Sequence, residues 1–259
     1  MDQTVTPSGA AQAEPMSFTD KLVNIIASPG TAYDNVRDTP VTHSTWLIPT
    51  LILVVVGTIL GYVVMSNPSL SSQFKQIATA QMEKQFNKAV EQGRMTAEQA
   101  EQARSQAESF SNTGMLVSRI VGGIVGPFIV LFAWSLVYWL LGKGVMKAVV
   151  PYWKVVEVVG LAFIITVMES IVTTILAIGL DRIFASPGLG LLISNFSMDN
   201  KWHMVAAAVN VFTFWNLAVV SLGLSKIFQK DYPKVLVLVF AIWAIWTVVM
   251  IFGLGALRG

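Results

Sequence analysis

The third of five long apolar runs in this sequence, Val155–Leu180, is long enough to cross a lipid bilayer, yet it contains two glutamates. A helix needs about 20 apolar residues to span the hydrocarbon core. A charged side chain near the bilayer centre costs about 2.5–3.5 kcal/mol on insertion scales. Glu169 is predicted to lie near the midplane, so it is the first candidate for a functional residue. Glu157 is predicted to lie near the cytosolic end, where it reaches water or pairs with Lys154.

The composition indicates a membrane-embedded protein. Hydrophobic residues make up 54% of the 259 residues and charged residues only 12%, whereas a soluble domain is typically about 25% charged. The net charge of +2 is too small to favour a nucleic-acid partner. The sequence has no Cys and two His, so disulfides and thiolate catalysis are excluded and a His-rich metal site is not expected.

The apolar runs predict an all-α fold. The five expected spans are Trp46–Met65, Ile120–Leu141, Val155–Leu180, Met204–Leu224 and Val235–Leu257. We therefore expect a polytopic integral membrane protein with five transmembrane helices in residues 46–257. An N-terminal amphipathic helix and a helical extramembrane insert between spans 1 and 2 complete the predicted fold.

The chain before the first span divides into two parts. Residues 1–17 are rich in small and polar residues and are predicted to form a disordered tail. Residues 18–45 are predicted to be a juxtamembrane segment, because apolar residues recur at helical spacing from Phe18 to Ala27. This helix either lies in the membrane interface or packs on the protein's own core. No apolar stretch begins the chain, so no cleaved signal peptide is expected.

Residues 69–114 form a polar excursion between the first two spans. A weak apolar stripe predicts one helix, which Gly93 interrupts. Thr96 followed by Gln99 predicts a capping box that starts a second helix, ending near Phe110. The charges alternate in sign, which is typical of a solvated surface. We expect a helical hairpin that is mobile or docked on the membrane face.

Two spans carry small residues four positions apart, a spacing that lets helices approach closely. These predicted helix-packing positions are Gly57 and Gly61 in the first span and Ser118, Gly122 and Gly126 in the second. The second group lacks the Lys-Ser/Thr that follows the glycines of a phosphate-binding loop, so that function is rejected.

The short loops predict the orientation. If the N-terminus is cytosolic, the cytosolic loops are residues 142–154 and 226–234, and each contains three Lys. Cytoplasmic loops carry an excess of Lys and Arg. We therefore expect a cytosolic N-terminus, a C-terminus on the opposite face and a non-cytosolic insert.

The surroundings of Glu169 allow two interpretations. Thr166 and Thr173 lie on or beside its face of the predicted helix. Asn210 and Asn216 of the fourth span can supply amide hydrogen bonds. In a functional interpretation, Glu169 binds a proton or cation in a transport path. In a structural one, a protonated Glu169 locks two helices together through a hydrogen bond.

No catalytic constellation is visible in the sequence. The two histidines head different spans and lie on opposite membrane faces in the predicted topology, so they cannot serve one site. No acidic motif has the spacing of metal ligands. We expect no enzymatic activity, no cofactor and no metal.

Four stretches resemble the YIP family, membrane proteins named for interacting with Ypt/Rab GTPases. They are Leu22–Tyr33, Trp46–Pro49, Tyr152–Val156 and Val211–Leu217 with the later Gly223-Leu224. The Gln/Glu-rich segment between the first two spans is similar to that of bacterial members. Members often carry a proline within the third span, where this chain has Val167–Ser170, so a proline kink is not carried over.

The resemblance implies five spans, a cytosolic N-terminus and no enzymatic activity, and it supplies no catalytic residues. Eukaryotic members are linked to Rab binding, vesicle trafficking and membrane shaping, whereas this layout points to the bacterial cytoplasmic membrane. One hypothesis is a non-enzymatic scaffold or adaptor in the bilayer, with a membrane or peripheral protein partner or as a homo-oligomer. The alternative is a small proton- or ion-coupled transporter that uses Glu169.

Overall fold

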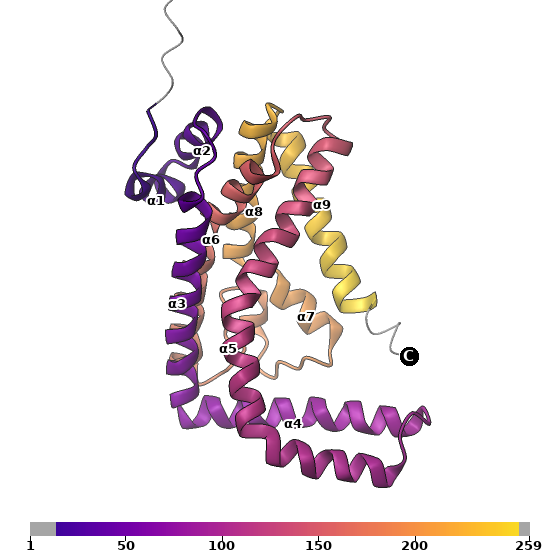
Figure 1. Ribbon diagram of the computed structural model, residues 1–259. Coiled ribbons are helices and arrows are strands. Elements are labelled where there is room, and N and C mark those ends of the chain that lie inside the picture. The colour runs from indigo at the N-terminus through magenta and orange to yellow at the C-terminus, as the bar shows by residue number, and fades with distance from the viewer. Residues whose placement is uncertain (1–13, 254–259) are drawn as a thin grey trace, which may run out of the picture. The chain divides into compact units, whose positions relative to one another are not determined.

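The computed structural model describes residues 14–253, with residues 107–120 described by their backbone alone. Its helices are α1 Phe18–Ala27, α2 Pro29–Asp38, α3 Ser44–Ser66, α4 Pro68–Glu91, α5 Ala97–Gly144, α6 Tyr152–Leu180, η1 Leu189–Leu192, α7 Lys201–Ala208, α8 Val211–Phe228, α9 Tyr232–Val248 and η2 Val249–Gly253 (Figure 1). Segments long and apolar enough to cross a membrane are Ser44–Ser66, Val121–Gly144, Tyr152–Leu180, Val211–Phe228 and Tyr232–Gly253. The predicted fold class is confirmed. The predicted tail lies largely outside the described residues.

The described residues group into two compact units. The first contains residues 14–50, 131–165 and 214–248, and the second contains residues 51–130, 166–213 and 249–253. The chain passes from one unit to the other inside the long apolar helices. Each unit is therefore built from parts of several spans.

The first half of α6 forms the core of the first unit. Its fully buried apolar side chains are Val155, Val156, Val158, Leu161, Ala162 and Ile165. Gly160 lets α3 come close to this core, because a Cβ at that position would lie 2.5 Å from Trp46 Cβ. Small residues serve such close approaches between membrane helices, where tight van der Waals packing drives association.

In the same unit, α1 and α2 pack on each other as a short helical hairpin (Figure 1). Ser17 Oγ accepts a hydrogen bond from Asp20 N at 3.1 Å and so caps α1. Pro29 starts α2, where its missing N–H costs nothing. α1 has the predicted bounds and is amphipathic: Ile25 is fully buried, whereas Val23 is 59% exposed.

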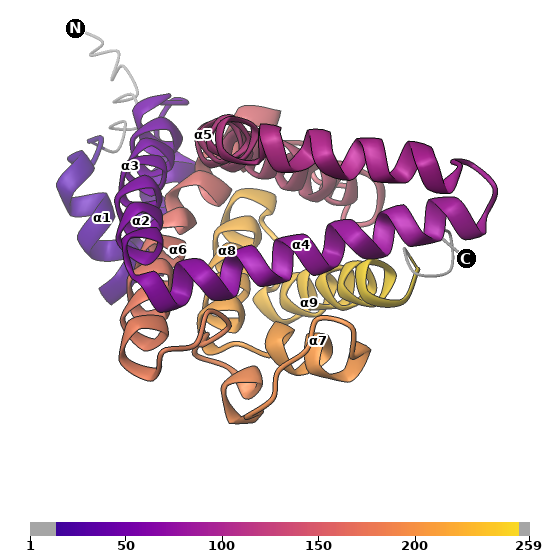
Figure 2. The same ribbon diagram turned by 90° about the horizontal axis from the view of Figure 1, so that it is seen from below.

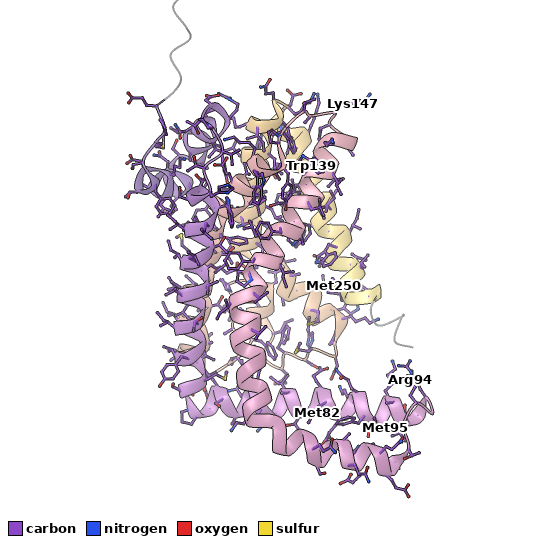
Figure 3. The ribbon with its side chains drawn as sticks, in the orientation of Figure 1. Met82, Arg94, Met95, Trp139, Lys147 and Met250 are labelled. Carbon is purple, nitrogen blue, oxygen red and sulfur yellow. The ribbon has the colours of Figure 1, made fainter. Side chains whose placement is uncertain are left out.

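The insert is a pair of helices in the second unit, in which α4 and the first part of α5 run side by side (Figures 1 and 2). Gly93, with φ +65°, turns the chain between them, next to Arg94 and Met95 (Figure 3). The predicted capping box is confirmed. Thr96 N donates to Gln99 Oε1 at 2.9 Å, and Gln99 N donates to Thr96 Oγ1 at 3.2 Å.

The second helix of the insert does not end near Phe110, so that prediction is wrong. α5 runs from Ala97 to Gly144 as one helix, and the insert continues directly into the second span. The segment Ser109–Gly114 consists of weak helix formers. Each of these costs only some tenths of a kcal/mol up to about 1 kcal/mol, and no proline interrupts the helix before Pro127.

The start of the insert is attached to the second unit, because α4 is bonded to the loop that follows α6. Gln73 Nε2 donates to Asp181 O at 2.9 Å, and Ile183 N donates to Gln73 Oε1 at 3.1 Å. Ser69 Oγ adds a hydrogen bond of 2.8 Å to Asp181 Oδ2. Gln73 therefore satisfies backbone groups on both sides of the turn that ends the third span.

The fourth span is shorter than the predicted Met204–Leu224. The helix is broken there: α7 ends at Ala208 and α8 begins at Val211. Leu189 N donates to Val209 O at 3.0 Å, so the loop that precedes α7 takes the carbonyl at the break. Apart from Asn210, the residues around this point are apolar. The break coincides with a hydrogen bond from a segment about 20 residues away.

Candidate functional site

A buried ion pair at the start of α6 connects the membrane domain to the N-terminal hairpin. Lys154 Nζ lies 2.9 Å from Glu157 Oε2, and the two side chains are 10% and 1% exposed. The residues are three positions apart and so face each other on the helix. The expected pairing is present, but the expectation that Glu157 reaches water is wrong. We call these two residues the Lys154–Glu157 clamp.

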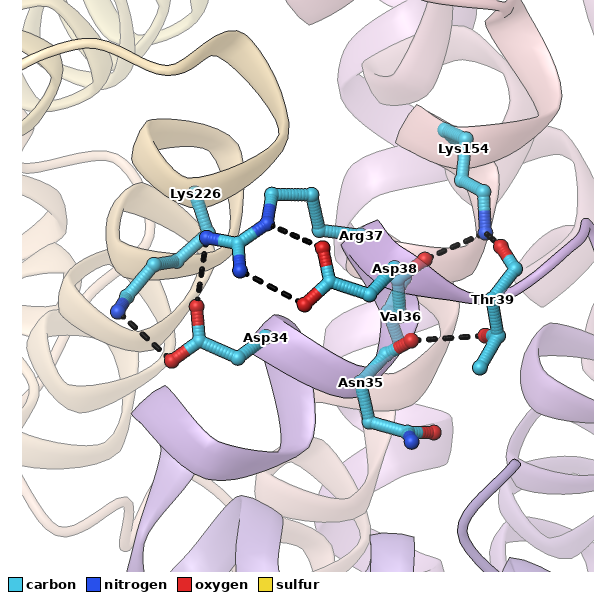
Figure 4. Close-up of polar contacts among 8 residues, drawn as sticks. All are labelled: Asp34, Asn35, Val36, Arg37, Asp38, Thr39, Lys154 and Lys226. Atoms are coloured by element: carbon cyan, nitrogen blue, oxygen red, sulfur yellow. Dashed lines mark hydrogen bonds and ion pairs between the residues drawn. The ribbon is translucent and has the colours of Figure 1, made fainter. Parts of the chain in front are cut away.

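The clamp holds the chain on both sides of the link between α2 and α3. Lys154 Nζ donates to Val36 O and, at 2.8 Å, to Thr39 O (Figure 4). Carbonyls at the end of a helix lack partners within the helix, and a cation there is favourable. On the other side, Thr42 N donates to Glu157 Oε1 at 2.7 Å. Such bonds are what make a buried ion pair tolerable.

Tyr33 fixes the hairpin at a second point. It is fully buried, and its hydroxyl donates to Val158 O at 3.1 Å. Gly223 of α8 leaves space for the ring, since a Cβ there would lie 2.8 Å from Tyr33 Cζ. Burial raises the pKa of Tyr33 above its usual value, so the hydroxyl stays neutral and remains a donor.

A partly exposed network ties α2 to the end of α8 (Figure 4). Lys226 Nζ lies 2.9 Å from Asp34 Oδ2, and Arg37 Nη1 lies 2.8 Å from Asp34 Oδ1. Two 2.7 Å hydrogen bonds from Arg37 hold the pKa of Asp38 below its usual value. Exposed pairs contribute about 0–1 kcal/mol each, so this network orients the hairpin more than it stabilises it.

Lys21 brings a second buried amine close to the clamp. It is 4% exposed, and its Nζ donates to Thr45 Oγ1 at 3.2 Å. Burial lowers the pKa of Lys21, while the charge of Glu157 raises it and that of Lys154 lowers it. The net effect of burial and of the neighbouring charges is a pKa of Lys21 below its usual value.

Glu169 belongs to a separate polar contact, in the second unit. Asn210 Nδ2 donates to Glu169 Oε1 at 2.6 Å, and Phe212 N donates to Asn210 Oδ1 at 2.9 Å. Asn210 therefore binds α6 and also caps the first turn of α8. Backbone groups left unpaired in the hydrocarbon layer are costly, which accounts for a polar pair at the break in the fourth span.

The other predicted members of the Glu169 site have different surroundings. Asn216 belongs to the first unit, where its Nδ2 donates to Ala162 O at 3.0 Å. Thr166 and Thr173 are half-buried on α6, and in the described part of the chain the side-chain partner of Glu169 is Asn210. The structure thus joins Glu169 to Asn210 and uses Asn216 in another helix contact.

The predicted small-residue positions do not pack inside the described chain. A Cβ built on Gly57, Gly61, Gly122 or Gly126 has no described atom within 4 Å, and the Ser118 side chain lies outside the described residues. Glycines that do make close helix contacts include Gly142, Gly160 and Gly223. Close approach of another helix at the predicted positions stays a prediction.

Sequence reasoning missed the roles of Lys21 and Tyr33, and for Lys154 it predicted the pairing with Glu157 but not the bonds to the α2–α3 link. The signal that pointed to two of them is their place in Leu22–Tyr33 and Tyr152–Val156, stretches on which the family resemblance rests. Within residues 14–253 no three His, Asp or Glu side chains gather as a metal site. The buried polar groups described here bind helices to one another.

Comparison with known proteins agrees with this architecture. The Yip1 domain family matches residues 23–254, a range that contains the clamp, Tyr33 and the Glu169–Asn210 pair. No curated protein and no solved structure matches the chain. The family match covers most of the sequence and confirms the resemblance. The chain is an integral membrane protein that belongs to the Yip1 domain family.

Proposed function

We propose that this protein is a non-enzymatic membrane scaffold or adaptor that presents its α1–α2 hairpin to a membrane or peripheral protein partner. The observation that carries the proposal is the fastening of this hairpin by buried polar contacts. Lys154, Glu157 and Tyr33 bind it to α6, although burying such groups is costly. A segment that served only as a flexible tether would need none of these contacts.

The exposed side of the hairpin supports this function. Val23 and Ile26 are 59% and 42% exposed on α1, next to polar residues of the same helix. An apolar strip of this kind suits a partner helix or the membrane interface. The basic loops favour a cytosolic hairpin, in a bacterial cytoplasmic membrane. The proposal includes no enzymatic activity and no cofactor.

Photo-crosslinking in cells tests the scaffold function. A photoreactive residue at Val23 should capture a defined protein partner, whereas one at Val55, which is exposed in the middle of α3, should capture lipid. Asp34→Asn with Lys226→Gln loosens the hairpin and should lower the yield at Val23. A yield unaffected by that pair of substitutions contradicts the proposal.

The Glu169–Asn210 pair favours a second candidate, a small proton- or ion-coupled transporter. It lies where the fourth span is broken, and broken helices form ion sites in several transporter folds. Reconstituted protein would then carry a proton or cation flux that Glu169→Gln abolishes. Crosslinking at Val23 that survives Glu169→Gln, without any flux in wild-type liposomes, favours the scaffold instead.

A further inference from the structure

The loop between α5 and α6, residues 145–151, is held firmly in the first unit. Ala148 N donates to Gly142 O at 2.8 Å. Trp139 Nε1 donates to Val150 O at 3.0 Å. Both halves of the loop are therefore bonded back onto α5.

Two lysines lie in and beside this loop. Lys147 has a left-handed backbone with φ +50°, a conformation that is uncommon for residues other than glycine. Lys143 Nζ lies 4.5 Å from the centroid of the Trp139 ring, which is cation–π distance. Figure 3 shows Trp139 on α5 and Lys147 in the loop that follows.

Exposed valines accompany the lysines. Val149 is 103% exposed and Val145 is 58% exposed, although water is an unfavourable surrounding for such side chains. No Asp or Glu occurs in residues 142–156, and the ion pairs found among the described residues include neither Lys143 nor Lys147. The loop thus combines apolar side chains with unneutralised positive charge.

We propose that this loop is a contact site for anionic phospholipid. Val145 and Val149 enter the interfacial layer, and the ammonium groups of Lys143 and Lys147 bind headgroup phosphate. Trp139 and Tyr152, whose ring centroids are 6.1 Å apart, flank the loop at the ends of two spans, where aromatic residues mark the membrane interface. Lysine side chains near span ends extend toward the headgroups.

Lipid retention by the purified full-length chain tests the site. The probe is a mixture of phosphatidylglycerol and phosphatidylcholine, and native mass spectrometry counts the lipids that stay bound. A lysine near an anionic surface is worth about fivefold in affinity. The double variant Lys143→Gln with Lys147→Gln should therefore reduce the preference for phosphatidylglycerol about 25-fold.

A second double variant provides a control with the same change in net charge. Lys230→Gln with Lys234→Gln alters the loop before α9, where Lys234 is already paired with Asp231 at 2.6 Å. It should change the preference less than about threefold. An equal loss in both variants would assign the preference to overall charge and overturn the proposal, as would an unchanged preference in the first.

Insertion of the loop into the membrane is tested by a fluorescent label at a single site. The chain contains no cysteine, so one introduced cysteine is labelled specifically. Val149→Cys provides a single site for a fluorescent label in the full chain, reconstituted in phosphatidylglycerol-containing vesicles. Lipids brominated near the headgroup should quench the label, and aqueous iodide should quench it weakly. Strong quenching by iodide alone would place Val149 in water and overturn the insertion.

Discussion

Glu157 Oε1 accepts a hydrogen bond from Thr42 N at 2.7 Å, although 115 positions separate the two residues in sequence. The other oxygen of the same carboxylate lies 2.9 Å from Lys154 Nζ. A single buried side chain therefore connects the start of α6 to the segment that leads into α3. The ion pair and the hydrogen bond together compensate for burying the carboxylate. Removing one partner therefore leaves a buried polar or charged group without compensation for its lost hydration.

Lys154→Met is expected to lower the free energy of unfolding by about 3–5 kcal/mol, because it leaves Glu157 buried and unpaired. Denaturant unfolding in detergent measures the loss. Lys234→Met is the control, since that lysine pairs with Asp231 on the surface, and it should change stability by about 1 kcal/mol or less. Equal effects of the two substitutions would show that the clamp contributes nothing special.

Lys21→Met, in contrast to Lys154→Met, is expected not to destabilise the protein at pH 7. Burial lowers the pKa of Lys21 in the folded protein, so between that lowered value and about 10.4 the unfolded chain binds more protons and stability rises with pH. Methionine removes this rise and the desolvation cost of the charge. Stability at pH 7 should be unchanged or higher, and the difference from wild type should shrink toward pH 10. A large loss at pH 7 would contradict this account.

Gly160→Ala is expected to destabilise the protein by about 1–3 kcal/mol, since its Cβ would lie 2.5 Å from Trp46 Cβ. Gly122→Ala has open space around the new methyl group and should be neutral or slightly stabilising. Thermal unfolding of both variants tests the pair. If Gly122→Ala proved the more harmful, a contact with another molecule at that face would be indicated.

Asn210→Ala is expected to cost about 1–3 kcal/mol, because both Glu169 and the N–H of Phe212 lose their partner. Asn216→Ala removes one bond, to Ala162 O, and should cost less. Glu169→Gln keeps an acceptor for Asn210 and should leave unfolding nearly unchanged. A Glu169→Gln variant as unstable as Asn210→Ala would mean that the carboxyl group itself is required.

Gln73→Ala is expected to loosen the contact between α4 and the loop after α6, where the Ser69–Asp181 bond remains. The backbone N–H of Ile183 loses its acceptor, so its hydrogen exchange should become faster without global unfolding. Gln76→Ala, on the exposed side of α4, is the control and should leave exchange at Ile183 as it is. Unchanged exchange in both variants would show that Gln73 does not hold the insert.

The spans and α1 were predictable because hydropathy and helical spacing are local properties of the sequence. The break between Ala208 and Val211 was not predictable, because it involves a hydrogen bond from Leu189 N, outside the helix, to Val209 O. The residues from Met204 to Val209 are apolar and contain no breaker. Local sequence therefore favours a helix that a distant loop interrupts.

The candidate site was predictable only in part. Glu169 stands out as an ionisable group in an apolar run, and its bond to Asn210 joins two residues that the sequence placed on neighbouring spans. Lys154 looks like any cation at the end of a span. Its role depends on the carbonyls of Val36 and Thr39, which are backbone groups and leave no trace in residue type.

The continuity of α5 has a consequence for how this protein can vary in length. Each residue of an α-helix advances the rotation by about 100°. One residue added between the insert and the second span would rotate the insert part of α5 by about 100° relative to the membrane-spanning part. That rotation would disturb the contact of α4 with the loop after α6. Residues added in the turn at Arg94 and Met95 would leave that rotation untouched. The insert can therefore vary in length at the turn between its helices, whereas a change of length within α5 alters the helix rotation.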